Sequence, residues 1–75
     1  MDEKLRMEML GEVIDGMKTK NRPTQDLDFC YANFIDSDGE CIATIPVVEA
    51  LDYLFNDVYH FEDFDLTDAV KVKVG

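Results

Sequence analysis

Carboxylates are the side chains in this sequence whose number and spacing could support chemistry. Asp and Glu together number 17 against 7 Lys and Arg, so the formal net charge is −10 at pH 7. No Lys or Arg occurs between Pro23 and Val70, and this stretch carries the acids Asp26, Asp28, Asp36, Asp38, Glu40, Glu49, Asp52, Asp57, Glu62, Asp63, Asp65 and Asp68. Such an array could coordinate a metal ion, exchange protons with a substrate, or imitate a row of phosphates.

The turn Asp36-Ser37-Asp38-Gly39 resembles a fragment of an EF-hand calcium loop. In that loop glycine occupies the sixth position, and oxygen ligands occupy the first and the twelfth. If Gly39 is the sixth residue, the first and twelfth positions fall on Phe34 and Ile45, whose side chains cannot bind calcium. The sequence therefore excludes an EF-hand, and we expect no metal site and no cofactor.

No group of residues in the sequence has the pattern of a catalytic site. The single histidine, His60, is expected on the polar face of a helix, where a histidine is usually just solvated. A Ser-His-Asp arrangement, a glycine-rich phosphate loop and zinc-ligand spacings are all missing from the sequence. We therefore expect a protein that is not an enzyme.

Residues 26–45 have the pattern of a β-hairpin. Two aromatic and β-branched runs flank a segment that is rich in turn residues, Asp36 to Glu40. A three-residue loop that ends on Gly39, with this glycine in the left-handed conformation, would place Ile35 opposite Cys41. This register gathers an apolar face that we expect to cover the core: Leu27, Phe29, Tyr31, Ile35, Cys41, Ala43 and Ile45.

Amphipathic helices are expected on both sides of this hairpin. Residues 2–18 place one set of apolar residues on a single helical side: Leu5, Met9, Leu10, Val13, Ile14 and Met17. A second helix is expected from Pro46, a residue that is tolerated in the first turn, to about His60. Its apolar stripe is Val47, Val48, Leu51, Leu54, Phe55 and Val58, and its polar face is Glu49, Asp52, Tyr53, Asn56, Asp57 and His60.

The last strand completes the expected fold. Strict alternation of valine and lysine over residues 70–74 predicts an edge strand with its valines inward and its lysines outward. The order helix, hairpin, helix, strand predicts one small α+β domain, residues 1–75, with two helices packed on a three-stranded antiparallel sheet. Cys30 and Cys41 fall on opposite faces of the hairpin, so we expect no disulfide between them. With no long apolar run and no signal peptide, we expect a cytoplasmic protein without a membrane partner.

The uncompensated charge between Pro23 and Val70 favours a partner with a basic surface, because an ordinary soluble surface mixes both signs. Carboxylates at i and i+3 or i+4 of a helix are ~5–6 Å apart, so they can stand in for phosphates. The same negative field disfavours direct binding of nucleic acid. We expect a basic surface, such as that of a nucleic-acid-binding protein or nuclease, to contact the hairpin tip, the polar helix face and the acidic tail: Asp36, Asp38, Glu40, Glu49, Asp52, Tyr53, Asn56, Asp57, Glu62, Asp63 and Asp65.

In its small size, heavy acidity and α+β character, the chain resembles phage-encoded inhibitors that mimic DNA, namely the acidic anti-CRISPR and anti-restriction proteins. The resemblance is one of general character over the whole chain and rests on no residue motif. It implies a protein of the host cytoplasm that sterically blocks a host nuclease without catalysis. The alternative is a small regulatory or dimerising protein-interaction module whose acids serve solubility, with a homodimer through the edge strand Val70 to Val74 as one form.

Overall fold

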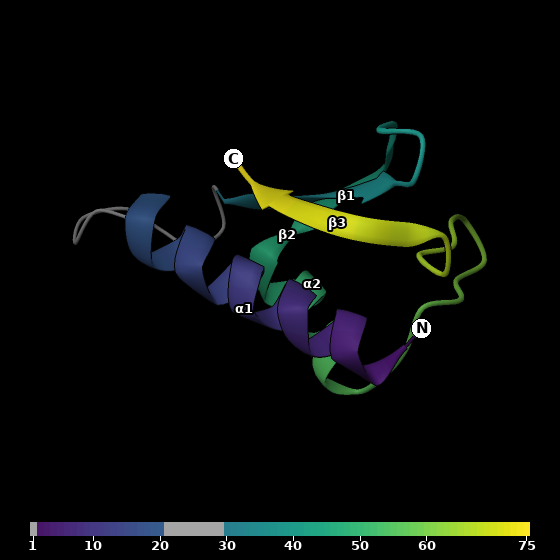
Figure 1. The fold of residues 1–75 in the computed structure, drawn as a ribbon, viewed down its shortest axis with the longest axis horizontal. Helices are drawn as coiled ribbons and strands as arrows, with labels where there is room; N and C mark the ends of the chain where they lie inside the picture. Colours follow the sequence, from purple (N-terminus) through teal and green to yellow (C-terminus); the bar gives the residue numbers. More distant parts are fainter. Residues whose placement is uncertain (1, 21–29) are drawn as a thin grey trace.

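The computed structural model describes residues 2–20 and 30–75, which form two helices and three strands. In chain order these are α1 (Glu3–Lys20), β1 (Tyr31–Asp36), β2 (Cys41–Pro46), α2 (Val47–Phe55) and β3 (Ala69–Val74). The strands form an antiparallel sheet in the order β2-β1-β3, and both helices lie on the same side of it (Figure 1). The predicted α+β fold, with the element order α-β-β-α-β, is confirmed.

The hairpin closes with the predicted three-residue loop. Ile35 pairs with Cys41, the Gly39 N–H donates to the Asp36 carbonyl at 3.1 Å, and Gly39 has a φ of 83°. A glycine adopts this left-handed conformation without a steric penalty, which is why the turn can close there. Residues 26–29 of the predicted hairpin lie outside the described residues.

The predicted core face of the hairpin is wrong for β1 but right for Ala43 and Ile45 of β2, because β2 contains a bulge. Ile35 pairs with Cys41, but Phe34 pairs with Ala43, so that Ile42 is an extra residue and the alternation of faces inverts beyond it. The buried residues of β1 are therefore Ala32 and Phe34, while Tyr31 is 43% exposed. Of the predicted face, Ala43 and Ile45 do turn toward the helices, and Cys41 is exposed. Leu27 and Phe29 lie outside the described residues.

Helix α1 packs along β3 through a glycine. A Cβ on Gly16 would lie 2.5 Å from the Val74 Cβ, so the absent side chain is what permits this approach. The predicted apolar side is largely confirmed, since Met9, Leu10 and Val13 are buried. Ile14 was predicted with them but is 43% exposed.

Helix α2 ends at Phe55 and not at His60 as predicted, because the chain reverses at Asn56 and Asp57. Asp57 has a φ of 58°, and the Val58 N–H donates to the Tyr53 carbonyl at 3.0 Å. A left-handed residue followed by this hydrogen bond is the Schellman arrangement that closes many helices. Asn and Asp tolerate the left-handed conformation better than other residues with a Cβ, so they can replace the usual glycine.

The C-terminal end of α2 is also tied to α1. The Arg6 guanidinium donates from Nη1 to the Leu54 carbonyl at 3.1 Å and from Nη2 to the Glu3 carboxylate at 3.4 Å. A cation at the carbonyl end of a helix is favourable, because that end carries partial negative charge. Arg6 therefore fixes how the two helices meet.

Strand β3 occupies one edge of the sheet, as predicted, but its alternation is interrupted. Asp36 pairs with Ala69 and Ile35 pairs with Lys71, which leaves Val70 unpaired in a bulge. Val72 is therefore buried and Val74 half-buried, whereas Val70, predicted inward, is 46% exposed. The two lysines point to the open face of the sheet, as predicted.

The core fills the space between the sheet and the two helices. Its fully buried large side chains come from α1, β1, α2 and β3 and from the connection before β3: Phe34, Met9, Leu54, Leu66, Val13, Val47 and Val72. Leu66 is held in place because its N–H donates to the Tyr59 carbonyl at 2.8 Å. The connection between α2 and β3 thus contributes to the core, although no helix or strand runs through it.

Candidate protein-binding surface

Helix α2 exposes a row of apolar side chains, the α2 patch, which consists of Val48, Leu51 and Phe55. Val48 is 50% exposed and Phe55 is 75% exposed, while Leu51 is half-buried. Together with Glu49, Asp52 and Asn56, these side chains line an open groove of about 510 Å³. An exposed apolar groove with polar borders is typical of a surface that binds another protein.

The α2 patch exists because the helix carries two apolar rows and buries only one. Val47, Ala50 and Leu54 recur at i, i+3 and i+7 and are fully buried against the core. The second row begins one residue later, so it is rotated by about 100° around the helix axis and remains outside. The prediction that both rows belong to a single core-facing stripe is therefore wrong.

Acids form the border of this groove. Glu49 and Asp52 are exposed, and the Asn56 amide Nδ2 donates to the Asp52 Oδ1 at 2.9 Å and to its carbonyl at 2.8 Å. These bonds hold the Asp52 carboxylate in one position at the groove's edge. No Lys or Arg lies in the sequence between Pro23 and Val70, so no basic residue of this segment neutralises the acids that border the groove.

Tyr53, which was predicted to lie among the helix acids, occupies another side of α2. It is half-buried, and its ring centroid lies 4.4 Å from that of Phe61, which in turn stacks on Phe64 at 4.4 Å. Aromatic pairs at such distances stabilise the fold beyond the area that they bury. Tyr53 thus attaches the connection that follows α2 to the helix.

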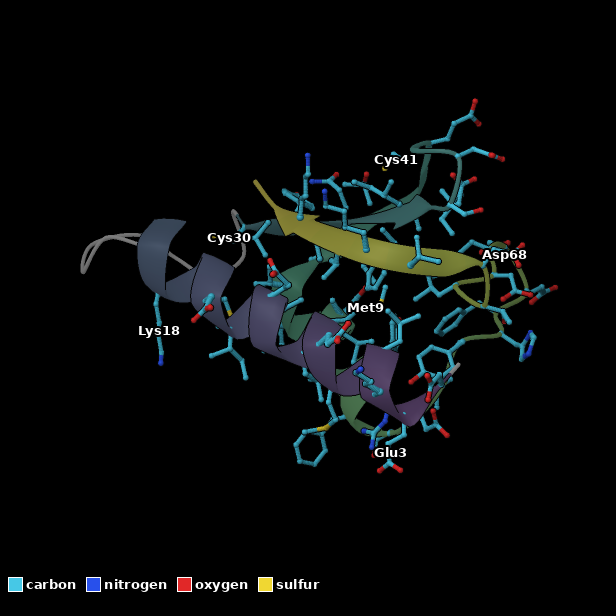
Figure 2. The ribbon with its side chains drawn as sticks, viewed as in Figure 1. Glu3, Met9, Lys18, Cys30, Cys41 and Asp68 are labelled. Atoms are coloured by element: carbon cyan, nitrogen blue, oxygen red, sulfur yellow. The ribbon has the colours of Figure 1, made fainter. Side chains whose placement is uncertain are left out.

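The acids at the hairpin tip form a second group, at the end of the sheet where β3 begins. The Asp36 Oδ1 accepts the N–H groups of Asp38 at 3.0 Å and of Glu40 at 2.9 Å, so this carboxylate stabilises the turn. Asp38 and Glu40 are exposed. Because Asp36 pairs with Ala69, the tip lies beside Asp68, and Figure 2 shows Cys41 and Asp68 at the end of the sheet away from Cys30.

The third group of acids lies on the connection from α2 to β3, where His60 and Asp65 form an isolated bridge. The His60 Nδ1 lies 3.0 Å from the Asp65 Oδ2, and the Thr67 N–H donates to the other carboxylate oxygen at 2.8 Å. Hydrogen bonds from Thr67, and then the nearby His60, lower the pKa of Asp65. His60 was predicted on a polar helix face; it lies beyond the helix and is paired, so that prediction is wrong.

The predicted partner-binding residues are thus distributed over three segments. Glu49, Asp52 and Asn56 share the groove with the α2 patch, Asp36, Asp38 and Glu40 lie at the hairpin tip, and Asp57, Glu62, Asp63 and Asp65 lie on the connection. Val48, Leu51 and Phe55 were predicted to face the core, so the groove was not predicted from the apolar spacing. The signal was there: apolar residues cover more than one face of the α2 segment, which is wider than a single buried stripe requires.

The described residues contain no cluster of three or more His, Cys, Asp or Glu side chains that could hold a metal ion. Cys30 is buried and Cys41 is exposed, and neither is in a disulfide. Over the described part of the chain, no helix combines the length and the apolar character needed to cross a bilayer.

Comparison with protein-family models, with curated proteins and with solved structures finds no match to this chain. The exposed apolar row on α2 and its acidic border are thus the physical basis for a functional assignment.

Proposed function

We propose that this chain is a non-catalytic acidic protein that binds a basic surface of another protein through the α2 patch. The observation that carries the proposal is the 75% exposure of Phe55, in one row with Leu51 and the half-exposed Val48, beside the acids Glu49 and Asp52. Burial of an exposed Phe or Val side chain contributes ~1.5–3 kcal/mol, so a partner that covers this row gains binding energy from it. Apolar centres with polar rims are where interfaces concentrate their affinity.

The charges of the groove select the kind of partner. Glu49 and Asp52 border the apolar row, so a complementary surface presents Lys or Arg around an apolar side chain. The net charge of −10 also attracts a basic partner from a distance, which speeds association at low salt. We therefore expect the association rate to fall steeply as salt is added.

A narrower form of the proposal is that the partner binds nucleic acid and that this chain blocks its basic groove. The exposed carboxylates of Asp38 and Glu40, at the tip of the hairpin, support it, because a projecting acidic turn can enter a groove that is built for phosphates. The general resemblance to acidic phage inhibitors of nucleases points the same way. In this form of the proposal, the chain inhibits its partner by occupying the partner's basic groove for nucleic acid.

The alternative is a regulatory module that binds a protein without imitating nucleic acid. The α2 patch favours it, since a row of phosphates has no apolar counterpart that Val48 and Phe55 could imitate. The two forms share the groove and differ in what the partner's surface normally binds. Competition with nucleic acid separates them.

The test starts with the immobilised chain, which is used to capture proteins from a lysate under washes of increasing salt. The captured partner, once purified, is titrated with the parent chain and with a V48S/F55S double variant, whose affinity should fall at least about tenfold. Val58 is exposed to a similar degree, 42%, but does not line the groove, so V58S is the matched control and should bind as the parent does.

Two results decide between the forms of the proposal. If excess duplex DNA displaces the chain from its purified partner, the nucleic-acid-blocking form is supported; if DNA and the chain bind together, the regulatory form is. Equal affinities of the parent and V48S/F55S would show that the α2 patch is not the contact surface.

A further inference from the structure

The edge strand β3 offers backbone groups to a further strand. The Gly75 N–H donates to the Tyr31 carbonyl at 3.0 Å, and the Tyr31 N–H donates to the Gly75 carbonyl at 3.3 Å. Because hydrogen-bonded pairs recur at every second residue of an antiparallel ladder, residues 71 and 73 also direct their backbone groups toward β1. Val72 and Val74 then direct theirs away from β1, on the side of β3 where the sheet has no further strand, while Val70 lies in the bulge at the start of the strand. Such a row is a template for strand addition.

The other edge of the sheet is a poorer template. The Val47 N–H donates to the Cys30 carbonyl, which continues the β1–β2 ladder and leaves Thr44 and Pro46 facing outward. Each edge strand has one bulge near its start, but Pro46 has no N–H to donate, and β3 contains no proline. A strand that adds to this sheet therefore pairs with β3.

Helix α1 runs below the edge of β3 that is not paired with β1 (Figure 1). Between the helix and the strand lies a groove of about 380 Å³, whose helix side carries Leu5, Met9 and Gly11 and whose strand side is residues 70–72. The space that a Cβ of Gly11 would enter is open, with no atom within 4 Å. An extended peptide can thus lie against β3 with alternate side chains over α1.

Charges of opposite sign lie on the two faces of the sheet beside the β3 edge. Glu8 and Glu12 line it from α1, and both are exposed. They lie four residues apart, or ~6 Å along the helix, which nearly equals the ~6.6 Å between alternate side chains of a strand. On the other face of the sheet, Lys71 and Lys73 are exposed. Basic side chains are therefore favoured on the helix side of an added strand and disfavoured on its other side.

We propose that β3 and the groove beside α1 bind an extended peptide segment of a partner protein, with Lys or Arg at every second residue, as an added strand of the sheet. This site is separate from the α2 patch and does not depend on it. A second copy of the chain is a poor occupant. Its Lys71 and Lys73 would meet the same lysines, and its Glu8 and Glu12 would meet the same acids.

The probe is a fluorescent peptide of about ten residues that alternates lysine and threonine, long enough to span a typical strand. Its control has the same composition, with all lysines in one block. The alternating peptide should bind at least about fivefold more tightly, because every lysine can then reach the helix side at once. Equal binding of the two peptides would overturn the proposal, since it would mean attraction by net charge alone.

The protein variants locate the site. An E8Q/E12Q chain should bind the alternating peptide about fivefold more weakly than the parent. An E49Q/D52N chain removes the same charge from the α2 groove and should bind it as the parent does. Circular dichroism establishes that both variants are folded. Equal losses in the two variants would contradict the assignment to α1 and β3.

N-methylated peptides test the strand pairing itself. Methyl groups on one set of alternate amides remove the N–H groups that face β3, and methyl groups on the other set remove only those that face solvent. One set should abolish binding and the other should leave it unchanged. If both methylated peptides bind like the parent peptide, no strand is added. A concentration-dependent dimer that excludes the peptide would assign this edge to a second copy instead.

Discussion

At the residue scale, the buried Tyr59 is a titratable group whose pKa lies far from its ordinary value. Tyr59 is 6% exposed, and its hydroxyl has no hydrogen-bond partner of ordinary geometry among the described residues. Burial, and then the neighbouring Asp57 carboxylate, raises its pKa to about 12. A buried hydroxyl without a partner costs stability, so the ring and not the hydroxyl is what the fold uses.

We predict that Tyr59 makes the fold sensitive to alkali. Its pKa is 10.0 in the unfolded chain and about 12 in the fold, so the folded state holds this proton more tightly. The resulting stability is fully present below pH 10 and is lost as the pH rises toward 12, by on the order of 2 kcal/mol. Y59F should lack this part of the loss and be equally or more stable at pH 7.

Denaturant titrations at pH 7 and across the alkaline range measure this difference. The matched control is Y31F, because Tyr31 is 43% exposed and its phenol is not enclosed by the core. The alkaline curve of Y31F should follow that of the parent. If the alkaline stability curve of Y59F also follows that of the parent, the hydroxyl of Tyr59 titrates in the fold as it does in water.

At the element scale, the C-terminal end of α2 and one close contact between α1 and β3 set the arrangement. Asn56 and Asp57 stop α2, and Arg6 donates to the Leu54 carbonyl near its end. The connection therefore leaves the helix early and returns to pack against the core. Gly16 lets α1 approach β3. Without that approach the helix could not form the floor of the groove beside the strand.

The two glycines of α1 give a prediction with an internal control. Nothing lies within 4 Å of a Cβ at Gly11, so G11A should raise the free energy of unfolding by ~0.5–1 kcal/mol through helix propensity alone. At Gly16 the new Cβ would lie 2.5 Å from that of Val74, so G16A should lower it by about 1–3 kcal/mol. Chemical denaturation of both variants measures the difference. Stabilisation by both substitutions would contradict the packing of α1 on β3.

At the scale of the whole molecule, charge opposes compactness. A net charge of −10 in 75 residues creates a repulsive field, and the contacts of Arg6 with Glu3 and of His60 with Asp65 each involve at least one carboxylate that is open to solvent. Exposed pairs contribute little to stability. The fold is therefore held by its apolar core against its own charge.

We predict that the melting temperature rises with salt. Sodium chloride at ~0.15 M shortens the screening length to ~8 Å, from ~30 Å at 0.01 M, and so weakens the repulsion between the acidic segments. An E62K/D63K variant, altered at two exposed positions of the connection, should melt at a higher temperature than the parent in low salt and show a smaller response to salt. Thermal melts that coincide at the two salt concentrations would show that the charges are already compensated.

The sequence by itself determined the order of the elements, the edge position of β3 and the hairpin loop. These features depend on local interactions: apolar spacing along a helix, alternation along a strand, and the left-handed conformation that Gly39 adopts at φ 83°. Local preferences are written in neighbouring residues, so they could be predicted without knowledge of the partners. The charge of the acidic border could be predicted for the same reason.

Only the tertiary structure decided which faces of the hairpin and of α2 meet the core. A single extra residue, Ile42, inverts which side chains of the hairpin share a face. The position of this bulge could not be predicted from the neighbouring residues. The sheet has one covered face, which α2 shares with α1, so α2 can bury the row of Val47 but not the row of Val48. Phe55 is exposed for this reason, because burial depends on the space that other elements leave. The candidate binding surface could therefore be recognised only after the chain was folded.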